Sequence, residues 1–322
     1  MQTKVLIADH NPVSRAVLHN MLSGWGYDVV PAAHGGEAWA SLQADDGPRL
    51  AILDSRLAGI DAVEICRRVR AENKMQYAYL LLLTDQGPIE DLVGALDAGA
   101  DDYITRPFHS QEFRARLQAG CRIIQLQARL VQAHEQLYEQ ATRDSLTGLW
   151  NRVAAIQILD REIARAARAE TSIAVIMADL DRFKQVNDTH GHLGGDAVLR
   201  EAASRMSGML RKYDSIGRYG GEEFLIVVPG CHLRDSLAVA ERLRDSVCSR
   251  RFLIGDQSYA ATCSFGLAWD DCRSSIDANR MLREADSALY VAKRKGRNRV
   301  ETFIPVLTLK TAEEQQLSPV EY

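Results

Sequence analysis

The sequence predicts an α/β protein in which two folded domains are joined by a long helix. In the first 120 residues, short apolar runs alternate five times with helical patterns, which predicts a parallel sheet covered by helices on both faces. In the second half, the pair Gly220-Gly221 separates two strand-like runs, which indicates a tight hairpin. The length of 322 residues gives each domain enough chain for its own core.

Composition narrows the class of protein. The net charge of −4 gives no reason to expect a nucleic-acid partner. No run of eighteen apolar residues occurs and the chain begins directly with a strand pattern, so we expect neither a membrane span nor a signal peptide. The six cysteines are scattered without a C-x-x-C pair. Free thiols in a reducing cytoplasm are the expectation.

The first apolar run, Lys4 to Asp9, ends on an acid and is followed by a helix start at Asn11 and Pro12. Functional groups of a parallel sheet collect at the carboxyl ends of its strands. Four polar residues occupy such ends: Asp9, Asp54, Thr84 and Arg106. The other expected strands are Tyr27–Val30, Leu50–Asp54, Tyr79–Thr84 and Asp102–Thr105.

This arrangement resembles the receiver domain of two-component response regulators, over residues 1–120. The resemblance implies a flavodoxin-like fold with strand order 2-1-3-4-5 and a cognate histidine kinase as a partner. It makes Asp54 the phosphoacceptor, Thr84 the switch hydroxyl and Tyr103 the switch aromatic residue, with Pro107-Phe108 following as in the family.

The sequence departs from the receiver pattern at the pocket itself. His10 replaces the second N-terminal acid, and Arg106 replaces the lysine before the proline. Ala58 and Ala62 replace a proline and a glycine that usually follow the phosphoacceptor. Two interpretations remain open: Asp54 still accepts phosphate from a dedicated kinase, or the pocket no longer takes phosphate.

The connecting segment, residues 110–143, contains no proline and a single glycine. Its apolar positions recur in steps of three and four, which predicts a hydrophobic seam of the coiled-coil type. We expect a parallel dimer stalk over residues 121–141; the alternative is an amphipathic helix packed on its own chain. The polar tail 305–322 is expected to be disordered. The seam consists of Ile123, Leu126, Leu130, Ala133, Leu137 and Gln140.

Two features of the second half indicate chemistry. Glu222 and Glu223 directly precede the apolar run Phe224–Val228, and acids at the mouth of a buried strand are costly unless a cation or proton chemistry uses them. The alternative is a solvated hairpin tip. The apolar strand Ser172–Ala178 ends in Asp179-Leu180-Asp181, and a helical pattern follows at once. A helix that starts there offers free N–H groups to an anion.

Residues Arg218–Phe224 resemble the signature loop of the GGDEF family, the diguanylate cyclases, in its GGEEF variant. The stretch Asp144–Arg152 resembles the family's opening D-x-L-T-G-L-x-N-R motif. Over residues 142–304, the resemblance implies an α+β domain with a four- or five-stranded antiparallel sheet, like nucleotidyl-cyclase and polymerase palms. Further matching positions are Phe183, Lys184, Asn187, Asp188, Gly191, His192, Gly195, Asp196, Thr262, Ser264, Gly266, Ala285–Lys293, Gly296 and Asn298.

The resemblance also implies an activity: two GTP molecules, held by a homodimer, are condensed into cyclic di-GMP and two pyrophosphates. Asp179, Glu223 and the Leu180 carbonyl resemble the ligands of magnesium or manganese, with two ions per GTP. Glu222 either assists loss of the 3′-hydroxyl proton or binds the second metal. Asp181 is expected to be structural.

Substrate and product sites follow from the same resemblance. Asn187 and Asp196 are expected to read guanine, while Phe183, Lys184, Lys293 and Arg297 would hold the triphosphate. His192 belongs to this substrate-binding region; His190 and His192 look like a metal pair, but magnesium prefers oxygen ligands, and the resemblance implies that they are turn residues. The inhibitory product site would comprise Arg211, Asp214 and Arg242, unless the first two form only a surface ion pair. The alternative function is a catalytically silent cyclic di-GMP receptor or receiver-driven scaffold.

Overall fold

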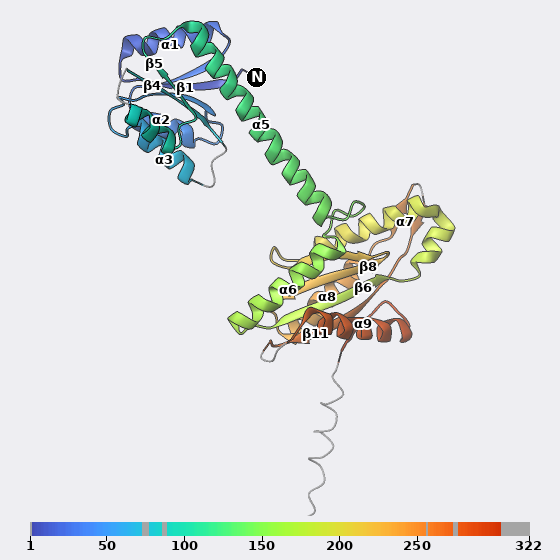
Figure 1. Cartoon of the computed structure of the whole chain (residues 1–322). Coiled ribbons are helices and arrows are strands. Elements are labelled where there is room, and N and C mark those ends of the chain that lie inside the picture. Colours follow the sequence, from blue (N-terminus) through green and yellow to red (C-terminus); the bar gives the residue numbers. More distant parts are fainter. Residues whose placement is uncertain (1, 73–76, 86–88, 256, 273–275, 304–322) are drawn as a thin grey trace, which may run out of the picture. The chain divides into compact units, whose positions relative to one another are not determined.

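The computed structural model describes residues 2–72, 77–85, 89–255, 257–272 and 276–303 (Figure 1). The chain divides into two compact units, with the boundary between Gln136 and Leu137. That boundary falls within the linker expected at 121–141, and the tail expected at 305–322 lies outside the described residues. No helix in the described ranges is both long and apolar enough to span a membrane.

The N-terminal unit contains a five-stranded parallel sheet in the order β2-β1-β3-β4-β5, which confirms the flavodoxin-like prediction. Each expected strand is present to within a residue or two. The strands are β1 (Lys4–Ala8), β2 (Asp28–Ala32), β3 (Leu50–Asp54), β4 (Tyr79–Thr84) and β5 (Asp102–Thr105). The helices between them are α1 (Pro12–Gly24), α2 (Gly35–Gln43), α3 (Ala62–Ala71) and α4 (Ile89–Asp97).

Helices cover both faces of this sheet (Figure 1). Successive residues of a strand point to opposite faces, so β1 contributes to two cores. Ile7 packs with Leu18 of α1 and with Phe113 of helix α5, whereas Leu6 packs with Leu42 of α2 in the other core. Continuous burial of β1, β3 and β4 explains why these strands read as apolar runs in the sequence.

A single helix, α5 (Ser110–Thr142), forms the connector. Its first turns are anchored on the sheet, where a Cβ at Gly120 would lie 2.5 Å from the Tyr79 ring, so only glycine permits this close approach. Further along, the predicted seam is open to solvent: Leu126, Leu130 and Leu137 are 62%, 65% and 65% exposed. These leucines therefore have no covering partner among the described residues of their own chain.

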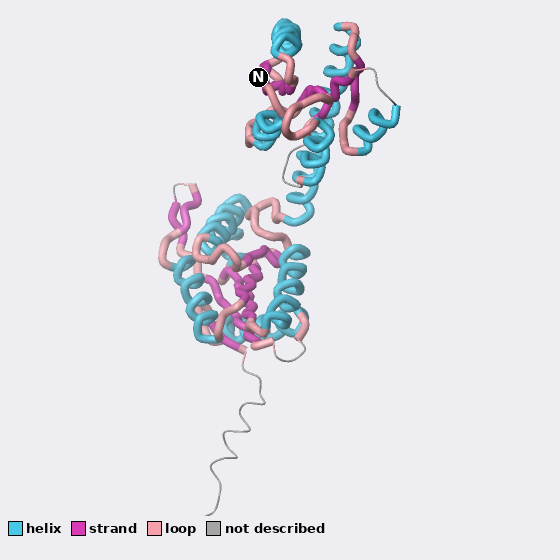
Figure 2. The backbone as a smooth tube through the Cα atoms, turned by 90° about the vertical axis from the view of Figure 1, so that its left-hand side faces the viewer, coloured by secondary structure: helices cyan, strands magenta, loops and turns pink. Residues whose placement is uncertain are grey.

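The C-terminal unit is built on a second five-stranded sheet, in the order β12-β11-β6-β8-β7 (Figure 2). The pairs β6–β8, β7–β8 and β11–β6 are antiparallel, as expected. One correction applies: β12 runs parallel to β11, because the chain crosses over through α9 before it returns to the sheet. The strands are β6 (Ile173–Leu180), β7 (Ser215–Gly220), β8 (Glu223–Pro229), β11 (Cys263–Asp270) and β12 (Val300–Thr302), with a separate hairpin of β9 (Phe252–Ile254) and β10 (Gln257–Tyr259).

Two helical layers enclose this sheet and fix its position. The layer of α7 (Phe183–Ser207) and α8 (Leu233–Cys248) shares one core with Ile176 and Phe224. The layer of α6 (Arg152–Ala169) and α9 (Ala278–Arg294) shares the other. A Cβ at Gly266 would lie 2.1 Å from the Ala285 carbonyl oxygen, so α9 packs directly on the β11 backbone. The β6, β8 and α9 residues that meet at one end of the sheet are thereby held rigidly.

Candidate functional site

The Gly-Gly pair forms the predicted hairpin between β7 and β8. Gly221 has φ of +50°, in the left-handed region that glycine adopts without strain, and the ladder shifts register between Arg218 and Gly220. Pairing of β8 with β6 places Glu223 opposite Asp179. The Leu180 N–H donates to the Glu222 carbonyl oxygen at 3.3 Å. The residues expected to bind metal are therefore brought to one end of the sheet.

Asp179 is the buried member of this group, with 7% of its surface exposed. The pKa of its carboxyl is raised to about 6, chiefly by burial; the hydrogen bond and charge of Lys293 oppose the shift, and the negative charges of Glu222 and Glu223 contribute to it. Lys293 Nζ lies 2.7 Å from Asp179 Oδ2. The site thus concentrates more negative charge than one lysine neutralises.

A cavity of about 330 Å³ opens beside Glu222 at the start of α7. Its lining unites most of the expected substrate residues: Phe183, Lys184, Asn187, His192 and Asp196, together with Leu199, Arg218, Gly221 and Glu222. Gly191, with φ of +70°, kinks α7 between Asn187 and Asp196, so that both side chains reach the same cavity. A Cβ at Gly195 would lie 2.0 Å from Asn187 Oδ1, so glycine makes room for that amide.

Two expected phosphate ligands lie elsewhere than in this lining. Lys293 is paired with Asp179, next to the acids of the hairpin. Arg297 is exposed after the end of α9, with φ of +67°, and its N–H donates to the Ala292 carbonyl oxygen at 3.0 Å. Asp181 is structural, as expected: it accepts hydrogen bonds from the hydroxyls of Thr262 and Ser264, each at 2.7 Å, and from the Asn298 N–H at 3.1 Å.

Arg218 is a site residue to which the sequence analysis gave no role. It lines the cavity, and its Nε donates to the Gly221 carbonyl oxygen at 2.8 Å. Its Nη1 lies 3.3 Å from Asp144, in the turn that follows α5. Burial disfavours the Asp144 charge, but hydrogen bonds from Thr147 and the Arg218 charge outweigh it and lower the pKa of Asp144. The position of Arg218 two residues before the glycine pair was the available signal.

The residues of the expected product site, Arg211 and Asp214, lie at the two ends of a turn. The Asp214 carboxylate accepts a hydrogen bond from the Arg211 N–H at 2.9 Å, while the Arg211 guanidinium donates to the Tyr213 hydroxyl at 3.0 Å. Arg242 donates to the Met209 carbonyl oxygen at 3.0 Å. Burial raises the pKa of Asp214, against the Arg211 N–H bond and the charges of both arginines. Its Oδ1 is buried and has no hydrogen-bond partner within the described part of the chain.

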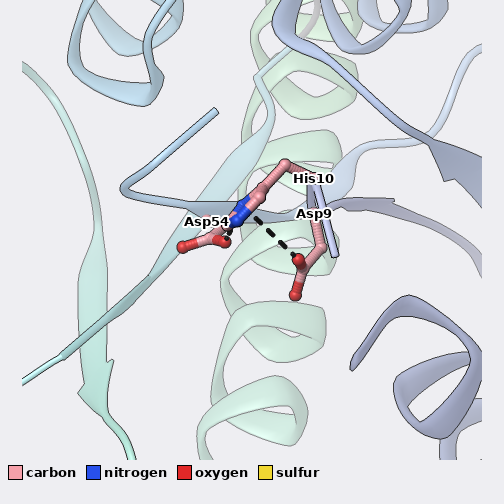
Figure 3. A group of neighbouring side chains, drawn as sticks. All are labelled: Asp9, His10 and Asp54. Atoms are coloured by element: carbon pink, nitrogen blue, oxygen red, sulfur yellow. Dashed lines mark hydrogen bonds and ion pairs between the residues drawn. The ribbon is translucent and has the colours of Figure 1, made fainter. Parts of the chain in front are cut away.

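In the N-terminal unit, Asp9, His10, Asp54 and Arg106 meet at the carboxyl ends of the strands, as predicted. Figure 3 shows the His10 ring directed at both carboxylates. Asp9 and Asp54 are fully buried. The Thr84 hydroxyl donates to the Asp85 carbonyl oxygen at 3.0 Å, and Tyr103 packs partly buried against the core on the α2 and α3 side. The pocket therefore contains its expected members, with histidine and arginine in direct contact with the acids.

The raised pKa of Asp179 predicts that its charge destabilises the metal-free fold. Below about pH 4, the carboxyl is protonated in both the folded and the unfolded chain, so no cost arises. The cost grows as the pH rises toward the folded pKa of about 6, and is complete above it. Asp179→Asn should therefore raise the midpoint of urea unfolding in chelator at about pH 8, with a gain that shrinks as the pH falls through 6.

Asp181→Asn is the matched control, because Asp181 is equally buried yet accepts three hydrogen bonds that a neutral amide satisfies less well. It should lower the midpoint. An Asp179→Asn variant that is less stable than the parent at about pH 8 would contradict the charge account.

Family models match both units of the chain. A model described as "Response regulator receiver domain" matches residues 5–118, and one described as "Diguanylate cyclase, GGDEF domain" matches residues 141–299. Both expected resemblances are thereby confirmed, and together the two matches take in most of the chain.

Individual relatives agree with this assignment. Response regulator PleD of Caulobacter vibrioides is 30% identical over 299 residues, which is 92% of this chain and 65% of PleD. The chain thus spans slightly less than two thirds of that relative. Diguanylate cyclase DosC of Escherichia coli is 38% identical over 174 residues, 52% of this chain and 37% of DosC. The crystal structure of the coiled coil and GGDEF domain of DgcB from Caulobacter crescentus in complex with c-di-GMP is 35% identical, with a TM-score of 0.54, covering 59% of this chain and 98% of that chain. The chain therefore contains a response regulator receiver domain followed by a diguanylate cyclase GGDEF domain.

Proposed function

We propose that the protein is a diguanylate cyclase that condenses two GTP molecules into cyclic di-GMP and two pyrophosphates. One observation carries the proposal: the cavity at the start of α7 unites Asn187 and Asp196 with Glu222, next to the acidic group around Asp179. An amide and a carboxylate can accept from the N1–H and amino group of guanine, a pattern that adenine does not present. The first N–H groups of α7 and the Lys184 ammonium suit a phosphate.

The acids of the site fit a magnesium or manganese ion. Asp179, Glu222 and Glu223 supply hard oxygen donors, and the Leu180 carbonyl adds a neutral one. The raised pKa of Asp179 marks an excess of negative charge that a dication would relieve. When bound, two such ions per GTP would neutralise triphosphate charge. Lys293 and Arg297 would then be available to the phosphates.

We assign Glu222 the role of a general base or of a ligand to the second metal. It lines the substrate cavity, whereas Glu223 points to the opposite side of β8, toward Met177 and Tyr219. Glu222 would therefore accept the 3′-hydroxyl proton or contribute to the second metal, and Glu223 would hold the first with Asp179. Arg218, bonded to the Gly221 carbonyl, would fix the hairpin that carries Glu222.

The C-terminal units of two protomers must face each other, since each would hold one GTP. The exposed seam of α5 supplies the surface for a parallel dimer, which raises the effective concentration of one half-site near the other. We also propose that the receiver unit regulates the cyclase activity and that the product, cyclic di-GMP, inhibits it. In the DgcB crystal structure, a GGDEF domain is in complex with c-di-GMP. Here the unpartnered Asp214 Oδ1 could accept from a guanine edge while Arg211 binds phosphate.

The alternative is a protein that binds cyclic di-GMP without making it. The exposed turn at Arg211 would serve a receptor equally well. The buried carboxylate of Asp179 favours the enzyme, because its desolvation is costly without a cation and a receptor needs no metal ligand at this position.

Glu222→Gln and Glu223→Gln test the chemistry, because each keeps the side-chain volume and removes the charge. We expect each to lower the rate of cyclic di-GMP formation from GTP at least ~100-fold, the scale of one lost acid–base or metal group. Calorimetric titration with a non-hydrolysable GTP analogue serves as the control for binding. Near-normal product from both variants would reject the assignment.

Arg211→Ala tests product inhibition. The residue lies outside the cavity lining, so initial rates should be unchanged, while inhibition by added cyclic di-GMP should weaken at least ~10-fold with the loss of a charge-assisted fork. Lys212→Ala, on the adjacent exposed position, is the matched control and should be inhibited like the parent. If Arg211→Ala is inhibited as strongly as the parent, this turn is not the product site.

Leu130→Asp combined with Leu137→Asp tests the stalk. Both leucines are 65% exposed in one chain, so the folded unit should tolerate the change, whereas a parallel seam would bury like charges. Light scattering should show a shift toward monomer, with specific activity falling on dilution. Gln125→Asp with Gln132→Asp, also exposed on α5 but on its face away from the seam, provides a control of equal charge. A fully active monomer would remove the stalk from the mechanism.

A further inference from the structure

Arg106 engages only one oxygen of each acid in the receiver pocket. Its Nη2 donates to Asp9 Oδ2 at 2.7 Å, and its Nη1 donates to Asp54 Oδ1 at 3.3 Å. The Ser14 hydroxyl also donates to Asp9 Oδ2, at 2.5 Å. The remaining oxygens face His10: its Nδ1 lies 3.0 Å from Asp54 Oδ2 and 3.9 Å from Asp9 Oδ1 (Figure 3). One nitrogen and two oxygen donors thus converge on the side away from the arginine.

These donors do not fit magnesium, the ion that a receiver pocket implies. Magnesium requires oxygen ligands in strict octahedral geometry and depends on the negative charge around it. His10 removes one of the acids that would supply this charge. The guanidinium of Arg106 neutralises the charge of one further carboxylate. With a neutral imidazole, Asp9, Asp54 and Arg106 together carry about one net negative charge.

The same donors fit a first-row transition-metal dication. Imidazole nitrogen is a preferred ligand of Zn²⁺, Ni²⁺ and Co²⁺, and carboxylates complete such sites. The three donor atoms lie within 4.8 Å of one another, and metal–ligand bonds of about 2.0 to 2.2 Å bring ligand atoms to roughly 3 Å apart, so small side-chain shifts suffice. The acids are fully buried, whereas the His10 side chain is 43% exposed, which leaves a path for the ion and room for water ligands.

We propose that the receiver pocket binds one first-row transition-metal dication through His10 Nδ1, Asp9 Oδ1 and Asp54 Oδ2, in preference to magnesium. Arg106 keeps its bonds to the other two oxygens and orients both carboxylates, as outer-shell partners of metal ligands do. The ion would bind Asp54 Oδ2, the oxygen that lies next to His10. The site lies within the N-terminal unit, so its test requires no measurement of cyclase activity.

Equilibrium dialysis of the full, chelator-stripped chain against Zn²⁺ or Mg²⁺, with elemental analysis of the bound ion, tests the proposal. The parent should bind one more Zn²⁺ per chain than Asp54→Asn. His10→Asn should weaken this ion at least ~10-fold, and His10→Asp should lower the ratio of Zn²⁺ to Mg²⁺ affinity by at least as much. With Co²⁺ as the probe, the visible absorption of the parent should change in His10→Asn, which reports nitrogen ligation directly.

Other histidines and cysteines of the chain also take up Zn²⁺, so the differences between variants are what count. His34→Asn is the matched control: His34 is an exposed histidine of the same unit, 3.4 Å from Glu37, and its loss should leave uptake by the pocket unchanged. Thermal melts establish that each variant is folded. Equal Zn²⁺ binding by the parent, His10→Asn and Asp54→Asn would reduce the His10–Asp54 contact to a hydrogen bond and overturn the proposal. So would an unaltered Zn²⁺ to Mg²⁺ ratio in His10→Asp.

Discussion

The antiparallel pairing of β6 with β8 is the constraint on which the C-terminal site depends. Its register aligns seven residue pairs, from Ile173 with Pro229 to Asp179 with Glu223, so the apolar pairs fix where the acids lie. A slip of one residue would turn the whole of β8 to the wrong face. Cores on both sides of the sheet enforce the register and hold Asp179 where its ionisation is unfavourable. Packing of the two cores therefore compensates for the unfavourable burial of the Asp179 charge, and a bound cation would reduce this electrostatic cost.

The hairpin that carries Glu222 has a second attachment. Arg218 binds the Gly221 carbonyl with one nitrogen and Asp144 with another, so one guanidinium ties the tip to the turn after α5. Asp144 itself is fixed by the N–H and hydroxyl of Thr147, at 2.9 and 2.7 Å. A change in the position of this turn would reach the hairpin through this partly buried ion pair. Such a link gives a physical route by which the helix could influence the chemistry.

Sequence patterns captured the local features of this protein well. Buried strands such as β3 and β6 read as continuous apolar runs, and the ends of those runs located Asp54 and Asp179 correctly. Glycine marked the hairpin at Gly221 because the left-handed φ leaves few other choices. Each of these signals lies within a few residues of the feature that it predicts. The order of the strands and the placement of the cavity residues needed the resemblance to known families.

Long-range pairings were not predictable, because no periodicity connects residues so far apart. Lys293 meets Asp179 across a whole domain, and Arg106 spans Asp9 and Asp54 with one planar fork. The sequence showed that His10 and Arg106 were unusual. It did not show that they contact different oxygens of the same two carboxylates. The parallel direction of β12 likewise depends on how α9 crosses the sheet.

The most direct measurement of the central claim is the product balance of the purified full chain with GTP and magnesium. Chromatography with mass detection identifies the nucleotide product, and an enzymatic assay counts pyrophosphate. The account predicts cyclic di-GMP and pyrophosphate in a ratio of one to two, with an initial rate that rises faster than linearly with protein concentration while dimers are scarce. Binding of cyclic di-GMP without consumption of GTP, in protein shown to be folded and dimeric, would contradict it.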